Sequence, residues 1–119
     1  MNELVRLRRG NRIVGYRRRE GNFRFFSADL YSWNGNDIPY ENEDYFTGTR
    51  DRNNRMLFSN DIINYREGEN TITCEVVRDE KLGTFFLFDR ENEDLIRLES
   101  LRNGREIIEQ LEWVSFVFG

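Results

Sequence analysis

Short runs of alternating apolar and polar residues, separated by turns rich in Gly and Asn, restrict the fold of this chain more than any other feature. Such alternation is typical of β-strands that bury one face. The 119 residues include one Ala and one Pro, while β-branched and aromatic residues, which favour strands, are common. The sequence therefore predicts a mainly β (β-rich α+β) fold, a small SH3-like barrel or meander with one short helix near the C-terminus.

The clearest hairpin lies at the N-terminus, over residues 3–18. Its two alternating runs flank a Gly-Asn dipeptide, which is typical of a two-residue hairpin turn. This turn predicts a register that sets Leu7 opposite Val14 on an apolar face. Arg6 and Arg8 then lie on the other face, which we expect to point into open solvent.

Other segments carry weaker signals of the same kind. Residues 31–44 are rich in Asn and acidic side chains, and we expect a long loop that is exposed at its acidic end. Asn103 and Glu106 resemble a capping box at the start of a short helix. The alternation around Cys74 predicts a buried thiol. Further strands are predicted at 23–26, 61–66, 71–78, 83–89 (a central strand) and 112–118.

Composition excludes several classes of function. At 14.4 kDa the chain fits one domain over residues 1–119, with a single core, and no apolar run reaches the roughly 18 residues that span a membrane. The chain has no His and one Cys, which excludes Ser-His-Asp and Cys-His catalytic centres, an internal disulfide and a Cys/His zinc site. Residues 89–94 are spaced like the start of a calcium loop, but Asp94 and Ser100 replace the required Gly and Glu. We expect no enzymatic activity, no cofactor and no metal.

Charge is distributed unevenly along the chain. Residues 1–24 have a net charge of +6 and residues 25–119 a net charge of −10, and 17 of the 18 basic residues are Arg. The acidic stretches 41–44 and 89–94 could neutralise the N-terminal arginines internally; a phosphate-bearing or acidic partner could do so instead. The candidate partner- or anion-binding arginines are Arg6, Arg8, Arg9, Arg12, Arg17, Arg18 and Arg19.

Aromatic residues in the long loop form a second candidate surface, consisting of Tyr31, Trp33 and Tyr40. They either contact a partner or fold back over the core. The pI near 5.0 argues against nucleic acid, whereas a small anionic nucleotide would sense only the local field of the arginines. The acidic majority either keeps the chain soluble or imitates nucleic acid in a basic groove of a host protein.

The segment 45–65 contains three short motifs in a fixed order: Phe46-Thr47-Gly48, an Asp51–Asn54 turn and Asp61-Ile62-Ile63. In this order they resemble the signature segment of the YopX family, small proteins of phages and prophages of Gram-positive bacteria. Residues 75–85 and 111–114 look like the family's next hairpin and closing strand. Asn54 stands where the family has a turn Gly, and Asn tolerates the left-handed conformation that such a turn requires.

The resemblance implies a β-rich protein of a mobile genetic element, and it supplies no catalytic residues. We therefore expect an accessory protein that binds and modulates a host bacterial protein in the host cytoplasm, with inhibition of a bacterial defence system as the most concrete form. The alternative is a nucleotide or nucleic-acid binder that uses the Arg-rich hairpin. Self-association stays open, and no membrane partner is expected.

Overall fold

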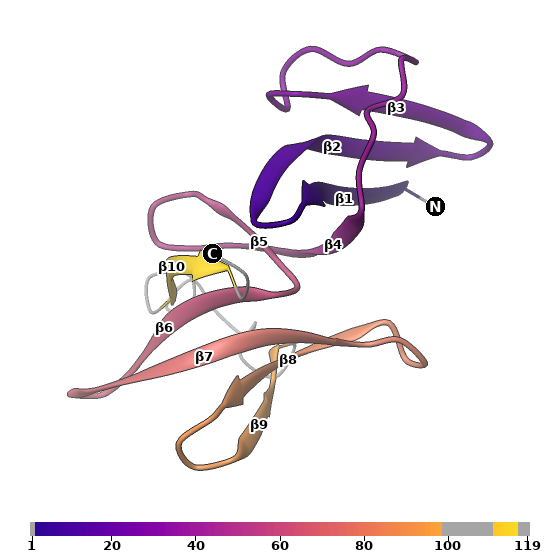
Figure 1. Cartoon of the computed structure of the whole chain (residues 1–119). Helices are drawn as coiled ribbons and strands as arrows, with labels where there is room; N and C mark the ends of the chain where they lie inside the picture. Colours follow the sequence, from indigo (N-terminus) through magenta and orange to yellow (C-terminus); the bar gives the residue numbers. More distant parts are fainter. Residues whose placement is uncertain (1, 99–110, 117–119) are drawn as a thin grey trace. The chain divides into compact units, whose positions relative to one another are not determined.

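The computed structural model describes residues 2–98 and 111–116, which form ten β-strands and confirm the mainly β fold (Figure 1). They are arranged in two five-stranded sheets, of order β3-β2-β1-β4-β5 and β10-β6-β7-β8-β9. The SH3-like arrangement stays a prediction, and the helix expected at Asn103 lies outside the described residues. The strands are β1 (Asn2–Arg9), β2 (Arg12–Glu20), β3 (Phe23–Ser27), β4 (Asn42–Arg50), β5 (Met56–Phe58), β6 (Asp61–Glu67), β7 (Asn70–Asp79), β8 (Thr84–Asp89), β9 (Asp94–Arg97) and β10 (Leu111–Phe116).

The chain divides into two compact units, with the boundary inside β4 between Phe46 and Thr47. Each unit buries its own cluster of apolar side chains, and the single-domain organisation stays a prediction. In the N-terminal unit, two tight turns make β1, β2 and β3 pair with one another, so their apolar residues meet locally. The N-terminal cluster consists of Val5, Leu7 and Phe26, with Val14, Ile38 and Tyr45 packed against it.

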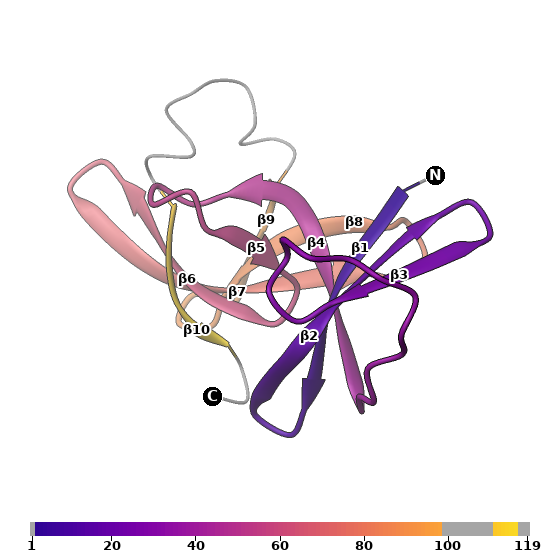
Figure 2. The same ribbon diagram turned by 90° about the horizontal axis from the view of Figure 1, so that it is seen from above.

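Strand β1 lies between β2 and β4 (Figure 1) and pairs antiparallel with both; Figure 2 shows the tight turn that joins β1 to β2. Its hairpin with β2 has a different register from the predicted one: Leu7 lies opposite Gly15, not Val14. The cause is a β-bulge between Leu7 and Arg8, which leaves one extra residue on β2. Next to the turn Arg9 pairs with Arg12, as a two-residue Gly-Asn turn predicts.

The long loop between β3 and β4 covers residues 28–41 and packs against β2. A Cβ atom at Gly15 would lie 2.6 Å from Ile38 Cδ1 and 2.8 Å from the carbonyl oxygen of Ser27, so only glycine lets the loop sit there. The predicted loop extended too far, since β4 begins at Asn42 and takes the acidic end into the sheet. Asp44, expected at an exposed position, is fully buried.

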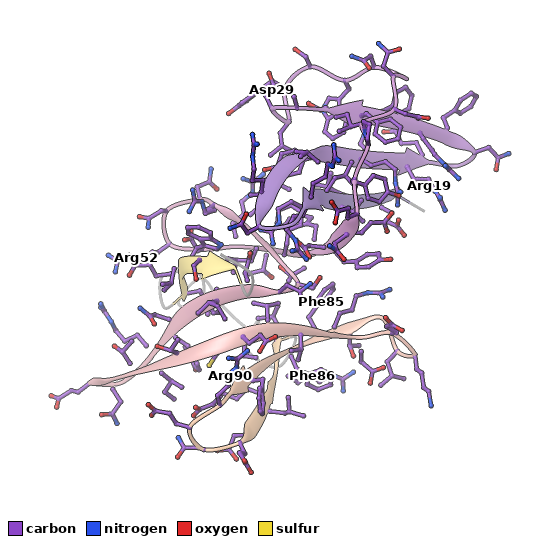
Figure 3. The ribbon with its side chains drawn as sticks, in the orientation of Figure 1. Arg19, Asp29, Arg52, Phe85, Phe86 and Arg90 are labelled. Atoms are coloured by element: carbon purple, nitrogen blue, oxygen red, sulfur yellow. The ribbon has the colours of Figure 1, made fainter. Side chains whose placement is uncertain are left out.

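In the C-terminal unit β6, β7, β8 and β9 pair consecutively as an antiparallel meander, and β10 joins its edge beside β6. Strand β8 lies between β7 and β9, as predicted for a central strand, and Phe85 and Phe86 lie on opposite sides of the sheet (Figure 3). Phe85 packs on the core, whose buried members are Leu57, Ile63, Tyr65, Cys74, Val76, Leu87, Leu98 and Leu111.

Cys74 is 1% exposed, which confirms its predicted burial. Burial, together with the nearby charge of Asp89, raises the pKa of its thiol to about 11, so the reactive thiolate is scarce at neutral pH. Within the described ranges, no helix has the length and apolar character needed to cross a membrane.

Two tight turns of the C-terminal unit contain Asn in the left-handed conformation, Asn54 with φ of 64° and Asn60 with φ of 70°. The sequence analysis expected Asn54 to tolerate this conformation, and it does. The Asn54 turn is held by Asp51, whose Oδ1 accepts hydrogen bonds from the backbone N–H groups of Asn53 at 2.9 Å and Arg55 at 2.8 Å.

Candidate functional site

Arg6 and Arg8, predicted to point into solvent, are instead buried around one carboxylate. Their exposed fractions are 3% and 2%, and Asp44 between them is 0% exposed. Arg8 makes two hydrogen bonds to Asp44, from Nε at 2.6 Å and from Nη2 at 2.9 Å, and Arg6 Nε donates to the same carboxylate at 2.9 Å. The prediction for these two arginines was wrong because β4 pairs with β1 and brings Asp44 opposite Arg6.

Arg17 is also buried and is held by side chains of the same unit. Its Nη1 donates to Glu43 Oε1 at 2.6 Å and to the Tyr40 hydroxyl at 2.9 Å, and Nη2 lies 3.4 Å from Glu3 Oε1. Burial alone would lower the pKa of Arg17, but the hydrogen bond and charge of Glu43 outweigh it and raise that pKa. Burial likewise would raise the pKa of Glu43, but the hydrogen bonds from Tyr40 and Arg17 lower it. Both groups therefore stay ionised at neutral pH.

The remaining arginines of the hairpin are more exposed. Arg9 Nε lies 3.8 Å from Glu41 Oε1, and both side chains are more than half exposed, so this ion pair adds little stability. Arg12 is exposed and Arg19 half-buried. The acidic stretch 41–44 therefore neutralises part of the cluster internally, which confirms the first of the two alternatives for Arg6, Arg8, Arg9 and Arg17.

Arg18 has a different environment, in which aromatic rings surround the guanidinium group. Its Cζ lies 4.8 Å from the centre of the Trp33 ring and 5.5 Å from that of Phe25. The side chain is 38% exposed, and its Nε lies 3.3 Å from Glu20 Oε1. A cation between two rings is stabilised by their quadrupoles and loses much of its freedom to reorient.

A network of turn hydrogen bonds places Trp33 over Arg18. Ser27 Oγ accepts from the Leu30 N–H at 2.8 Å, and Asp29 Oδ1 accepts from the Tyr31 and Ser32 N–H groups at 2.9 and 3.0 Å. The indole N–H of Trp33 donates to the Leu30 carbonyl at 3.0 Å and fixes the ring. The backbone hydrogen bonds from Ser32 and Tyr31 lower the pKa of Asp29, which lies in the loop after β3 (Figure 3).

The register of β2 with β3 puts an exposed phenyl ring beside this arrangement. Arg18 pairs with Phe25 and Glu20 with Phe23, and residues that pair directly or alternate along a strand share a face. Phe23 therefore shares the face of Arg18, and it is 71% exposed. We call Arg18, Phe23, Phe25 and Trp33 the β2–β3 surface.

Two of the three predicted loop aromatics contact other side chains of the N-terminal unit, and the third is exposed to solvent. Trp33 is half-buried against Arg18, and Tyr40 donates its hydroxyl to Glu43 at 2.6 Å. Tyr31 is 89% exposed. The loop therefore folds back on the sheet through Trp33 and Tyr40, and contact with a partner stays a prediction for the exposed Tyr31.

Phe23 and Asp44 were not predicted as site residues. Phe23 was predicted to lie in a strand, but the side of the sheet that it faces was not predicted. Its position directly after the Glu20-Gly21-Asn22 turn places it at the exposed end of a hairpin. Asp44 gave no local signal, because its importance comes from pairing with a strand 36 residues earlier in the sequence.

The described residues show no arrangement that points to metal chemistry. Within them, no group of three His, Cys, Asp or Glu side chains could hold a metal ion. Asp89, which begins the calcium-loop-like run, uses its carboxylate to cap its own turn: Oδ1 accepts from the Glu91 N–H at 3.0 Å and Oδ2 from Asn92 Nδ2 at 2.8 Å. The β2–β3 surface remains the arrangement best suited to contact another molecule.

No protein-family model, curated protein or solved structure matches this chain.

Proposed function

We propose that this chain is a non-enzymatic phage or prophage accessory protein that binds a host bacterial protein in the host cytoplasm and modulates it, with inhibition of a defence system as the form of modulation. The resemblance of residues 45–65 to the YopX signature supports the phage setting. The exposed Phe23 beside the ring-stacked Arg18 supports protein binding and is the observation that carries the proposal.

Aromatic residues and Arg are the side chains most enriched at the energetic centres of protein interfaces. A phenyl ring that is 71% exposed gains nothing from folding but would lose its contact with water when a partner covers it. Arg18, already held between two rings, would lose little conformational freedom on binding. The β2–β3 surface thus combines an apolar anchor with an ordered charged group.

The alternative, nucleotide or nucleic-acid binding by the Arg-rich hairpin, has less support. It needs several arginines that face solvent together, whereas Arg6, Arg8 and Arg17 are buried against carboxylates. The net charge of −4 also repels a polyanion.

To test the proposal, the full chain is immobilised and used to capture proteins from a nuclease-treated lysate of a Gram-positive bacterium. Quantitative mass spectrometry then measures the amount of each captured protein. Phe23→Ser is expected to reduce the captured amount of a specific protein by roughly 30-fold, the equivalent of an interface anchor worth about 2 kcal/mol. Leu82→Ser is the matched control, because Leu82 is similarly exposed (68%) but belongs to the other unit. This variant should capture the same amount of the specific protein as the wild type does.

Two results would count against the proposal. Capture that disappears after nuclease treatment and weakens steeply with salt would favour the nucleic-acid alternative. Equal capture by Phe23→Ser and wild type would remove the β2–β3 surface from the interface.

A further inference from the structure

The Arg18 guanidinium group has hydrogen-bonding capacity that the fold leaves unused. In the part of the chain that the structure describes, neither of its Nη nitrogens has a hydrogen-bond partner; Nε lies 3.3 Å from Glu20 Oε1 but is buried and makes no hydrogen bond. Arg17, its neighbour on β2, uses both Nη nitrogens on carboxylates and a hydroxyl. Arg18 therefore differs from the buried arginines, because its Nη groups are ordered and can donate hydrogen bonds to a molecule outside the fold.

We propose that Arg18 recognises the side-chain carboxylate of an acidic peptide segment in a partner protein, with Phe23 packing against the residues that flank this carboxylate. The inference rests on the proposed function and names the chemistry of the partner. A planar guanidinium group offers two parallel N–H donors to a carboxylate, a geometry that an ammonium group cannot reproduce.

The stacking explains why this arginine, and not its neighbours, is suited to the task. The rings of Trp33 and Phe25 both lie within cation–π distance of the guanidinium group and restrict its motion, and the Trp33 indole is itself held by its hydrogen bond to the Leu30 carbonyl. A donor that is already oriented gives up less entropy on binding. Arg12, by contrast, is an exposed side chain at the other end of β2.

Local charge favours a carboxylate over a phosphate. Arg18, Arg19 and Arg24 give the β2–β3 hairpin a positive balance against Glu20. Glu20 nevertheless lies close enough to Arg18 to repel a dianion more strongly than a monoanion. The exposed ring of Phe23 adds an apolar contact for peptide side chains.

The experiment is a titration of the full chain, labelled with ¹⁵N, in which the Arg18 Nε–H and Trp33 indole N–H signals are followed. The first probe is a capped tripeptide with Glu between two Phe, the second is its Gln twin, and the third is inorganic phosphate. We expect the Glu peptide to shift both signals saturably and to bind at least about tenfold more tightly than the Gln twin or phosphate.

Two variants locate the effect. Arg18→Lys retains the charge but loses the planar fork, so the Glu peptide is expected to bind about tenfold more weakly, whereas Arg12→Lys should bind as the wild type does. The wild-type titration by itself remains decisive if Arg18→Lys does not fold. Equal binding of the Glu and Gln peptides, tighter binding of phosphate, or full binding by Arg18→Lys would each overturn the inference.

The titration needs no cellular partner, so its failure can be told apart from failure of the proposed function. Intact peptide binding without specific capture from the lysate would overturn the host target and leave the carboxylate site standing. Specific capture that depends on Phe23, without any peptide binding, would overturn the carboxylate site alone.

Discussion

Replacing Asp44 by Asn is expected to lower the free energy of unfolding by about 3–5 kcal/mol, because it leaves the buried guanidinium groups of Arg6 and Arg8 without their shared carboxylate. This loss is a large part of the roughly 5–15 kcal/mol by which small domains are stable. Urea unfolding followed by circular dichroism measures it. The matched control is Glu41→Gln, which removes the exposed ion pair with Arg9 and should cost no more than about 1 kcal/mol.

A triple variant separates the charge effect from a packing effect. Changing Arg6 and Arg8 to Met and Asp44 to Leu removes all three charges together, and we expect it to recover most of the stability lost in Asp44→Asn, since apolar groups of similar volume replace buried ion pairs without penalty in other proteins. A triple variant as unstable as Asp44→Asn would show that the size and shape of these side chains matter more than their charge.

In the C-terminal unit, Asp51→Ala is expected to lower the free energy of unfolding by about 3–5 kcal/mol. The Asp51 side chain is 2% exposed and accepts three backbone hydrogen bonds. Two of them close its own turn, and the third, from the Trp113 N–H at 3.0 Å, ties β10 to that turn across 62 residues of sequence. Alanine would leave these partly buried N–H groups without their acceptor.

Asp79→Ala is the control for this prediction. Asp79 accepts from the N–H groups of Lys81 at 2.9 Å and Leu82 at 3.2 Å in an exposed turn, so water can replace its carboxylate. We expect this variant to lose about 0.5–1.5 kcal/mol. Similar losses for Asp51→Ala and Asp79→Ala in urea unfolding would show that the link to β10 contributes little.

Local features of the fold were predictable from the sequence. The Gly-Asn turn fixed the position of the first hairpin, and alternation around Cys74 identified its buried face correctly. The bulge at Leu7 was not predictable, because it depends on which neighbours β1 acquires. The short strands β5 and β9 were also missed, since three or four residues carry little periodicity.

The candidate site was predictable in composition but not in arrangement. The sequence analysis singled out both Arg18 and Trp33, yet nothing in the spacing of a strand residue and a loop residue says that they stack. Arg6 and Arg8 were placed in solvent because they alternate with the apolar residues of a sheet that was expected to bury one face only. The pairing of β4 with β1 is a long-range contact that brings the Asp44 carboxylate to both arginines.

We propose that the buried arginines Arg6 and Arg8 stabilise the N-terminal unit, whereas Arg18 serves binding. The most direct measurement is urea unfolding, together with lysate capture, of the double variant Arg6→Gln/Arg8→Gln and of Arg18→Gln. The double variant is expected to lose about 3 kcal/mol or more, because the buried Asp44 carboxylate loses its ion pairs with both arginines. Arg18→Gln should stay within about 1 kcal/mol of the wild type and lose capture. Full stability in the double variant, or full capture by Arg18→Gln, would contradict this division.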